Sequence, residues 1–69
     1  MQAAETLRYY RLQAGLTLKD VARTVRRSPG WLSAIERGHR RPTALERDRL
    51  SDALGVDLAD VIAAREEFR

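Results

Sequence analysis

Cysteine is absent from the 69 residues of this chain, and histidine occurs once, at His39. These absences exclude a disulfide framework, a thiolate zinc site and a Cys/His nucleophile, so the domain has to be stabilised by packing alone. Long apolar runs are also missing, and the first residues lack the basic-then-apolar order of a signal peptide. We therefore expect a cytoplasmic protein without a membrane anchor.

The chain is short enough for one domain only, which we place over residues 1–69. A small helical bundle is the most economical way for so few residues to bury a core, and a large catalytic cleft is not expected. The acidic pair Glu66 and Glu67 has no cleft to act in, and His39 has no obvious carboxylate partner. The sequence thus predicts no enzyme, no catalytic residue, no metal site and no cofactor.

Positive charge is concentrated in the first part of the chain. Residues 1–42 hold nine Lys/Arg and three Asp/Glu, a net charge of +6, whereas residues 43–69 hold four and seven, a net charge of −3. Clustered positive charge attracts DNA phosphates and gains by releasing their condensed counterions. An Arg-rich and Ala-rich composition is also typical of a GC-rich genome, but the uneven distribution makes the first part the candidate DNA-binding surface.

Capping residues and glycines divide the chain into five short predicted helices, with no strand signal. The first helix spans residues 3–14 and ends at Gly15, whose backbone suits the left-handed conformation that closes a helix. Its inner face is expected to hold Leu7, Tyr10 and Ala14. This helix should therefore pack on the rest of the bundle through one apolar side.

The second and third predicted helices are separated by a short turn. A Thr-x-x-Asp run from Thr17 to Asp20, a near match to a capping box, predicts the second helix, which runs to Val25. The third begins where Ser28 offers a hydroxyl to free amides and Pro29 supplies a φ already fixed at the helical value; it ends at Gly38. The apolar faces of the pair hold Leu18, Val21, Ala22, Val25, Leu32 and Ile35.

Two more helices are predicted after a basic loop at residues 39–42. Residues 43–46 form a complete Thr-x-x-Glu capping box, which opens a fourth helix that ends at Gly55. Asp57 can cap a fifth helix. The apolar residues of that last helix are Leu58, Val61 and Ile62.

Five short pieces of sequence stand in a characteristic order and at characteristic separations. The pieces are Gly15-Leu16-Thr17, Val21-Ala22, Leu32-Ser33-Ala34-Ile35-Glu36-Arg37-Gly38, Arg41-Pro42 and Ala53-Leu54-Gly55-Val56. Together they resemble the phage-repressor and Cro type (Xre family) of helix-turn-helix DNA-binding domains, over about residues 5–62. The resemblance implies an all-α fold, a compact five-helix lambda-repressor-like bundle with its helix-turn-helix unit at residues 17–38.

By this resemblance the third predicted helix is the recognition helix, which enters the roughly 12 Å wide major groove. Its outward positions are the base-contact candidates: Pro29, Gly30, Ser33, Ala34 and Arg37. Similar domains often carry Gln, Asn, Lys or Arg at the positions of Pro29, Gly30 and Ala34, which here cannot form a side-chain hydrogen bond to a base. We expect Ser33 and Arg37 to make the polar contacts, with DNA shape and methyl contact from Ala34 supplying much of the selectivity.

Helix amino ends and basic loops supply the expected phosphate contacts, because free amides, helix dipoles and arginines all attract anions. The candidates are Thr17, Leu18, Lys19, Arg23, Arg26, Arg27, Ser28, Trp31, Arg40 and Arg41. For any single arginine a solvated surface charge is an equally good interpretation, but four of them in two loops that flank one helix favour a common role. Trp31 lies beside Leu32 and Ile35, a setting more typical of partly buried packing than of a backbone contact.

Two further features concern the framework of the domain. The resemblance implies that Arg11 pairs with Glu36, a contact that specifies the fold and is not a binding site. The fourth predicted helix departs from the family pattern at Arg47 and Asp48, where similar domains keep apolar residues. Either Leu45 substitutes through a shift in register, or that helix is displaced.

The last predicted helix, at residues 57–68, is the candidate dimer interface. Its candidates are Leu58, Val61, Ile62, Arg65 and Phe68. A two-fold dimer would match the half-sites, about 34 Å apart, of a palindromic operator.

The sequence therefore predicts a bacterial or phage transcriptional regulator, such as a repressor, that binds double-stranded DNA as a homodimer. One alternative is an antitoxin-type or other protein-interaction module, which would hold a protein partner and repress its own operon. Another is the N-terminal DNA-binding domain of a longer regulator.

Overall fold

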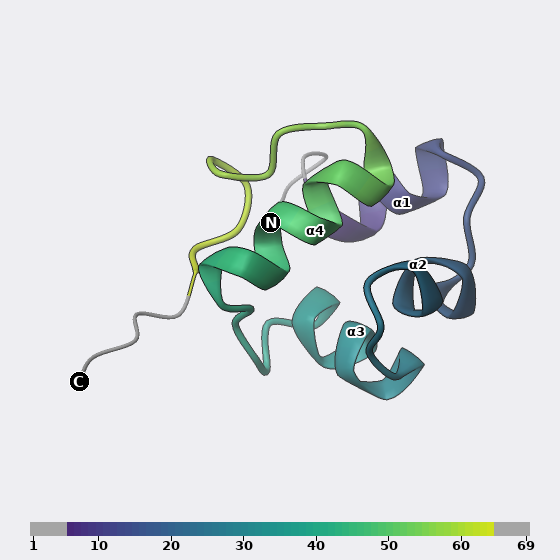
Figure 1. Ribbon diagram of the computed structural model, residues 1–69, viewed down its shortest axis with the longest axis horizontal. Coiled ribbons are helices and arrows are strands. Elements are labelled where there is room, and N and C mark those ends of the chain that lie inside the picture. The colour runs from purple at the N-terminus through teal and green to yellow at the C-terminus, as the bar shows by residue number, and fades with distance from the viewer. Residues whose placement is uncertain (1–5, 65–69) are drawn as a thin grey trace.

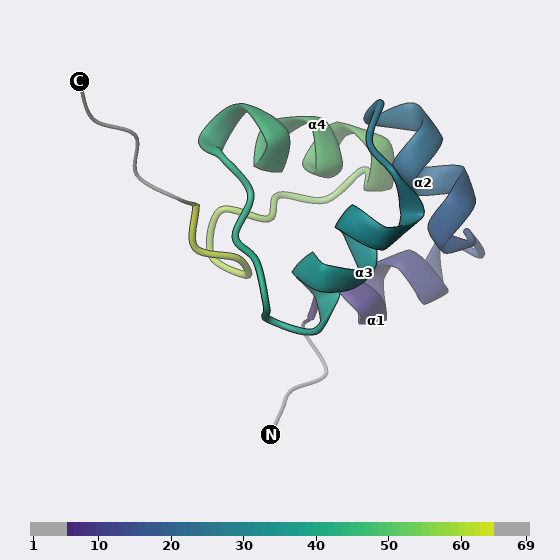
Figure 2. The same ribbon diagram turned by 90° about the horizontal axis from the view of Figure 1, so that it is seen from below.

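The computed structural model describes residues 6–64, and within this range it contains four helices and no β-strand. The helices are α1 (Leu7–Gln13), α2 (Leu18–Thr24), α3 (Pro29–Glu36) and α4 (Ala44–Leu54). α3 lies along one side of the molecule, across the core from α4, with α2 beside it (Figure 1). The view from the α3 side shows α1 and α4 flanking it (Figure 2). Over the described range, no helix is long and apolar enough to span a bilayer.

Hydrogen bonds at the amino ends explain where the helices begin. The box at the start of α2 is complete, because Thr17 Oγ1 accepts from the Asp20 amide at 3.0 Å and the Asp20 carboxylate accepts from the Thr17 amide at 3.0 Å. The predicted capping box that opens α4 is also present. The predicted start of α1 at residue 3 is wrong, since Thr6 is extended and caps the Tyr9 amide, so the helix begins at Leu7.

The core is formed by one cluster of apolar side chains from all four helices and the segment after α4. The buried residues are Leu7, Val21, Ala22, Val25, Trp31, Leu32, Ile35, Leu50 and Leu58. The predicted inner face of α1 needs one correction, because Ala14 is exposed and Arg11 is buried instead. Ala14 is the C-cap residue of α1, whereas Arg11 lies one helical turn after Leu7 on the same face.

The predicted fifth helix is not present within the described residues. Asp57 does cap, through a hydrogen bond from the Ala59 amide to its carboxylate at 2.9 Å, but only one turn follows, closed by the Ile62 amide on Leu58 O at 3.0 Å. The Ile62 carbonyl accepts from Arg47 Nη1 at 2.9 Å. A side chain of α4 thus holds the segment that follows the helix.

The packing of α4 contradicts the first sequence-based alternative, a shift in register that buries Leu45. Leu45 is 59% exposed and does not substitute for the missing apolar residues, while Asp48 is exposed. Arg47 is half-buried and uses its guanidinium to hold the segment after the helix. The core contact of α4 comes instead from Leu50, which is fully buried.

Candidate nucleic-acid interface

α2 and α3 form a helix-turn-helix in which a small residue permits close contact. Ala22 is 1% exposed, and Leu32 of α3 is fully buried in the same cluster. Two helices joined by a short turn approach closely only where a side chain is small. The burial of Ala22, which was predicted to lie on the apolar face of this helix pair, is consistent with such a close crossing.

The outward side of α3 is open to solvent and carries the base-contact candidates. Pro29, Gly30 and Arg37 are exposed, and Ser33 and Ala34 are half-buried. A β-carbon built at Gly30 would meet only Ser28 Oγ, at 3.8 Å, which is an ordinary contact. The fold therefore does not require glycine at this position, where the missing side chain leaves room for a molecule that approaches from outside.

The amino end of α3 presents one free amide. Pro29 has no N–H, and the Trp31 amide donates to Ser28 Oγ at 3.0 Å. Among the hydrogen bonds of the described residues, none satisfies the amide of Gly30. This donor lies at the positive end of the helix dipole, where an anion is favoured.

The turn between α2 and α3 contains a strained residue. Its backbone bonds, from the Arg27 amide to Ala22 O at 2.9 Å and from the Arg26 amide to Arg23 O at 3.2 Å, close α2 in a Schellman motif. This motif needs a left-handed residue, and Arg26 supplies it with φ 62°. A left-handed residue other than glycine costs about 1–2 kcal/mol.

The side chain of Arg27 makes contacts with other side chains of the protein. Its Nη1 lies 3.3 Å from Glu46 Oε2, and its guanidinium carbon lies 5.0 Å from the centroid of the Trp31 ring. Trp31 is 5% exposed, and its Nε1 is buried without a hydrogen-bond partner. The ring is thus packed in the core, as the sequence favoured, and is not available as a contact to the DNA backbone.

The basic loop after α3 is fixed at its ends and open in its middle. The His39 amide donates to Ala34 O at 2.9 Å, and Pro42 is fully buried. Arg40 and Arg41, between these anchors, are exposed. The loop lies along the same side of the molecule as α3 (Figure 1), so its arginines flank the carboxyl end of that helix.

The other phosphate-contact candidates lie on α2 and around its ends. Thr17, Lys19, Arg23, Arg26 and Ser28 are exposed, and Leu18 is half-buried. Thr17 and Ser28 already accept a capping amide through the hydroxyl oxygen, but each hydroxyl still has a proton to donate. Exposed donors therefore flank α3 at both ends.

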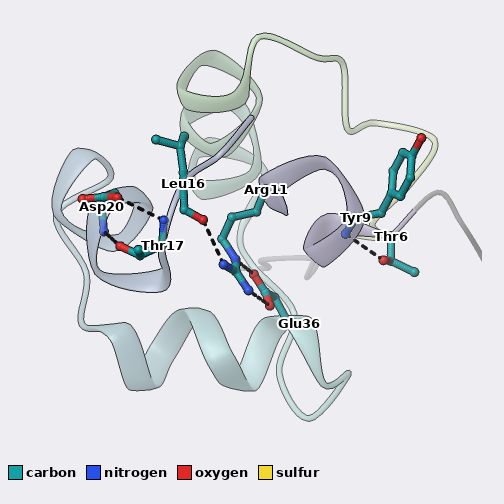
Figure 3. A network of polar contacts seen from close by, with 7 residues as sticks. All are labelled: Thr6, Tyr9, Arg11, Leu16, Thr17, Asp20 and Glu36. Carbon is teal, nitrogen blue, oxygen red and sulfur yellow. Dashed lines mark hydrogen bonds and ion pairs between the residues drawn. The ribbon is translucent and has the colours of Figure 1, made fainter. Parts of the chain in front are cut away.

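A buried ion pair holds α1 against α3 (Figure 3). Arg11 Nε lies 2.6 Å from Glu36 Oε2 and Nη2 lies 3.1 Å from Oε1, with side chains 9% and 6% exposed. Arg11 Nη1 also donates to Leu16 O at 3.0 Å. The hydrogen bond with Glu36 raises the pKa of Arg11 above its ordinary value. The pairing implied by the family resemblance is confirmed, and it fixes the carboxyl end of α3.

The predicted dimer candidates divide into three groups. Leu58 is fully buried in the core of its own chain, so it is not an interface residue. Val61 and Ile62 are half-buried and line a hollow of about 350 Å³ together with Leu7 and Ile35. The remaining two candidates, at positions 65 and 68, lie outside the described residues.

Comparisons with known proteins agree with this geometry. A family model described as a helix-turn-helix domain matches residues 2–64. The chain is 33% identical over 99% of its length to the HTH-type transcriptional regulator DdrOP3 of Deinococcus deserti, and it spans only 53% of that relative. It is 35% identical over 83% of its length to the uncharacterised HTH-type transcriptional regulator y4dJ of Sinorhizobium fredii, covering 74% of it.

A solved structure is also similar. The crystal structure of the clp gene regulator ClgR from Corynebacterium glutamicum superposes with a TM-score of 0.75 at 38% sequence identity. The match covers 83% of this chain and 72% of that one. The four helices described above are therefore arranged as in a known gene regulator.

Proposed function

Because this chain belongs to the helix-turn-helix domain family, we propose that it is a sequence-specific double-stranded DNA-binding transcriptional regulator of the Xre type. One observation carries the proposal: the outward side of α3 is open to solvent and is flanked at both ends by exposed cationic and hydroxyl groups. α3 has eight residues and is about 12 Å long, which fits the major groove.

The exposed basic side chains are assigned to the phosphates. Lys19 and Arg23 on α2 would contact the backbone on one side of the groove, and Arg40 and Arg41 the backbone on the other. The free amide of Gly30 adds a donor at the amino end of α3. These contacts set the orientation of the domain on DNA without reading its sequence.

Only a few groups on α3 are then left to distinguish one DNA sequence from another. Ser33 and Arg37 are the polar side chains on its outward side, and Arg37 can donate two hydrogen bonds to a guanine. Ala34 offers a methyl group to thymine, and Gly30 permits close approach of the backbone. With so few donors, sequence-dependent DNA shape contributes a large share of the preference.

Negative charge elsewhere on the molecule favours this orientation. The exposed acidic residues of α4 and the segment after it are Asp48, Asp52, Asp57 and Asp60. α4 lies across the core from α3 (Figure 1), so a duplex that approached the opposite side would be repelled.

We also propose that two copies bind a palindromic site. A helix about 12 Å long faces only about three to four base pairs, and so short a sequence occurs too often in a genome to single out a promoter. Two copies on half-sites about one helical turn apart would double the sequence that is read. Val61 and Ile62 remain as candidates for the contact between copies, and sedimentation with and without the selected duplex tests the stoichiometry.

Selection of bound duplexes from a randomised pool, followed by sequencing at near-physiological salt, tests the proposal directly. The expected result is an enriched motif with two symmetric half-sites. Enrichment of a single short motif would retain DNA reading and remove the palindrome. No enrichment would refute sequence-specific binding and would favour a protein partner, which pull-down experiments would then identify.

The salt dependence of binding tests the loop. Removing both side chains in Arg40→Ala/Arg41→Ala is expected to weaken binding to every duplex and to flatten log K against log salt by about 0.9 for each phosphate that is no longer neutralised. Arg49→Ala, on the exposed part of α4, is the matched control and is expected to leave the slope unchanged. An unchanged slope in the loop variant would remove the loop from the interface.

A further inference from the structure

Arg27 touches three structural elements at once. It lies in the turn after α2, its guanidinium covers the ring of Trp31 in the first turn of α3, and its Nη1 faces the carboxylate of Glu46 in the first turn of α4. The second oxygen of that carboxylate accepts from the Thr43 amide at 2.9 Å. One arginine and one carboxylate thus connect the turn and the beginnings of α3 and α4.

These contacts oppose a role for Arg27 as a phosphate ligand. Turning the guanidinium toward DNA would expose the ring of Trp31 and would leave Glu46, whose side chain is 18% exposed, as an uncompensated negative charge. A phosphate near that carboxylate would also be repelled. Arg23 and Arg41 are exposed without an ion pair among the described residues, so they are better placed for the contact.

The position of this cluster gives it a consequence for DNA reading. The basic loop runs from the end of α3, past the buried Pro42, to the start of α4, which is the helix that Glu46 caps. The angle of α3 and the position of the loop therefore depend on the same contact, the ion pair between Arg27 and Glu46. The buried pair of Arg11 and Glu36 holds the other end of α3.

Resting on the proposed function, we infer that Arg27 is a positioning residue: it fixes the recognition helix through Trp31 and Glu46 and does not itself bind phosphate. An exposed ion pair and a cation–π contact are each weak, so their loss is expected to shift the helix without unfolding the domain. Loss of the arrangement is therefore expected to lower discrimination between sites and to leave the number of phosphate contacts unchanged.

The test compares binding of Arg27→Met to the selected duplex and to an unrelated duplex over a range of salt. Met keeps much of the side-chain stem and removes the charge and the planar head. The ratio of the two affinities is expected to fall about tenfold, and the slope on the unrelated duplex is expected to stay as in the unmodified protein. A slope lowered by about 0.9, with the ratio unchanged, would overturn the inference.

Three further variants sharpen the comparison. Arg23→Met shows the signature of a missing phosphate ligand, a lower slope with an unchanged ratio, and Arg49→Met is expected to change neither. Glu46→Gln keeps an acceptor for the Thr43 amide but removes the charge that holds Arg27. It is expected to lower the ratio as Arg27→Met does, and the double variant should be no worse than either single one. If Arg27→Met does not fold, the binding of Glu46→Gln alone tests the inference. Stronger binding to both duplexes, with an unchanged ratio of the two affinities, would overturn it.

A measurement on the protein without DNA tests the positioning role of Arg27 independently of the proposed function. Trp31 is the single tryptophan of the chain, so its fluorescence reports on the start of α3. Both Arg27→Met and Glu46→Gln are expected to shift its emission in the same direction. An unchanged emission in both variants would refute the positioning role, whereas failure of the unmodified protein to select any duplex would refute only its use in DNA reading.

Discussion

Replacing the strained residue of the turn by glycine is expected to stabilise the domain and to weaken its binding to DNA. Arg26 has φ 62°, in the left-handed region, whereas the other three left-handed positions of the described chain are Gly15, Gly38 and Gly55. Arg26→Gly relieves about 1–2 kcal/mol of backbone strain. About 0.5–1 kcal/mol of this is offset because glycine gives the unfolded chain more freedom. The net gain is therefore about 0.5–1 kcal/mol.

Thermal unfolding measures the first effect and salt-dependent binding the second. For a domain of this size, the net gain corresponds to a rise in Tm of about 2–8 °C. Removal of one phosphate ligand should lower the salt slope by about 0.9 on every duplex. Arg26→Ala is the matched control, because it removes the same side chain and keeps the strained backbone. It is expected to bind as weakly as Arg26→Gly without the gain in Tm.

Two results would refute this reasoning in different ways. A higher Tm with unchanged binding would mean that the side chain does not reach DNA. A lower Tm in Arg26→Gly would mean that the side chain stabilises the fold more than its backbone strain destabilises it. That stabilisation would come from the hollow of about 370 Å³ between the turn and α4, which Arg26 lines together with Arg49 and Asp52.

Three further predictions concern the framework and the open side of α3. Glu36→Ala should destabilise the domain by about 3–5 kcal/mol in chemical unfolding, because it leaves the buried Arg11 unpaired; a loss below about 1 kcal/mol would show that water solvates the arginine. The amide of Thr17, and then its hydroxyl, lower the pKa of Asp20 below 3.8, so its stabilising effect is complete above that pH and is lost as the pH falls through the folded-state pKa. Asp20→Asn should therefore flatten acid unfolding below about pH 4, and identical curves would contradict the assignment. Gly30→Ala should raise stability by about 0.5–1 kcal/mol and weaken DNA binding, whereas full binding would show that DNA does not approach that backbone.

Features that depend on a few neighbouring residues could be predicted from the sequence. Each helix start at Thr17, Ser28 and Thr43 depends on a hydrogen bond between residues three positions apart. A short stretch of sequence is therefore enough to predict it. The pairing of Arg11 with Glu36 spans 25 positions and came only from the family resemblance, since no local pattern indicates it. The base-contact and phosphate-contact roles remain predictions, although the structure leaves most of those residues exposed.

Features that depend on packing between distant segments could not be predicted. The direction of Leu58 is set by the core that Leu50 and the other helices form, and a pattern of apolar residues does not distinguish a self-packed face from a dimer face. The segment where the fifth helix was predicted is held by the contact of Arg47 with Ile62 O, fifteen positions away. The ion pair between Arg27 and Glu46 could likewise not be predicted, because arginine and glutamate are equally suited to an exposed surface.

The stability of the recognition helix resides mainly in what surrounds it. α3 has eight residues, including Pro29 and Gly30 on its open side, and a helix so short is not stable alone in water. It is held from behind by Leu32 and Ile35, at its end by the buried ion pair and at its start by Arg27. Substitutions on the open side therefore leave the supporting contacts intact. This separation predicts that the sequence preference of the domain can be changed at Ser33 and its exposed neighbours with little effect on folding, whereas changes behind the helix alter both.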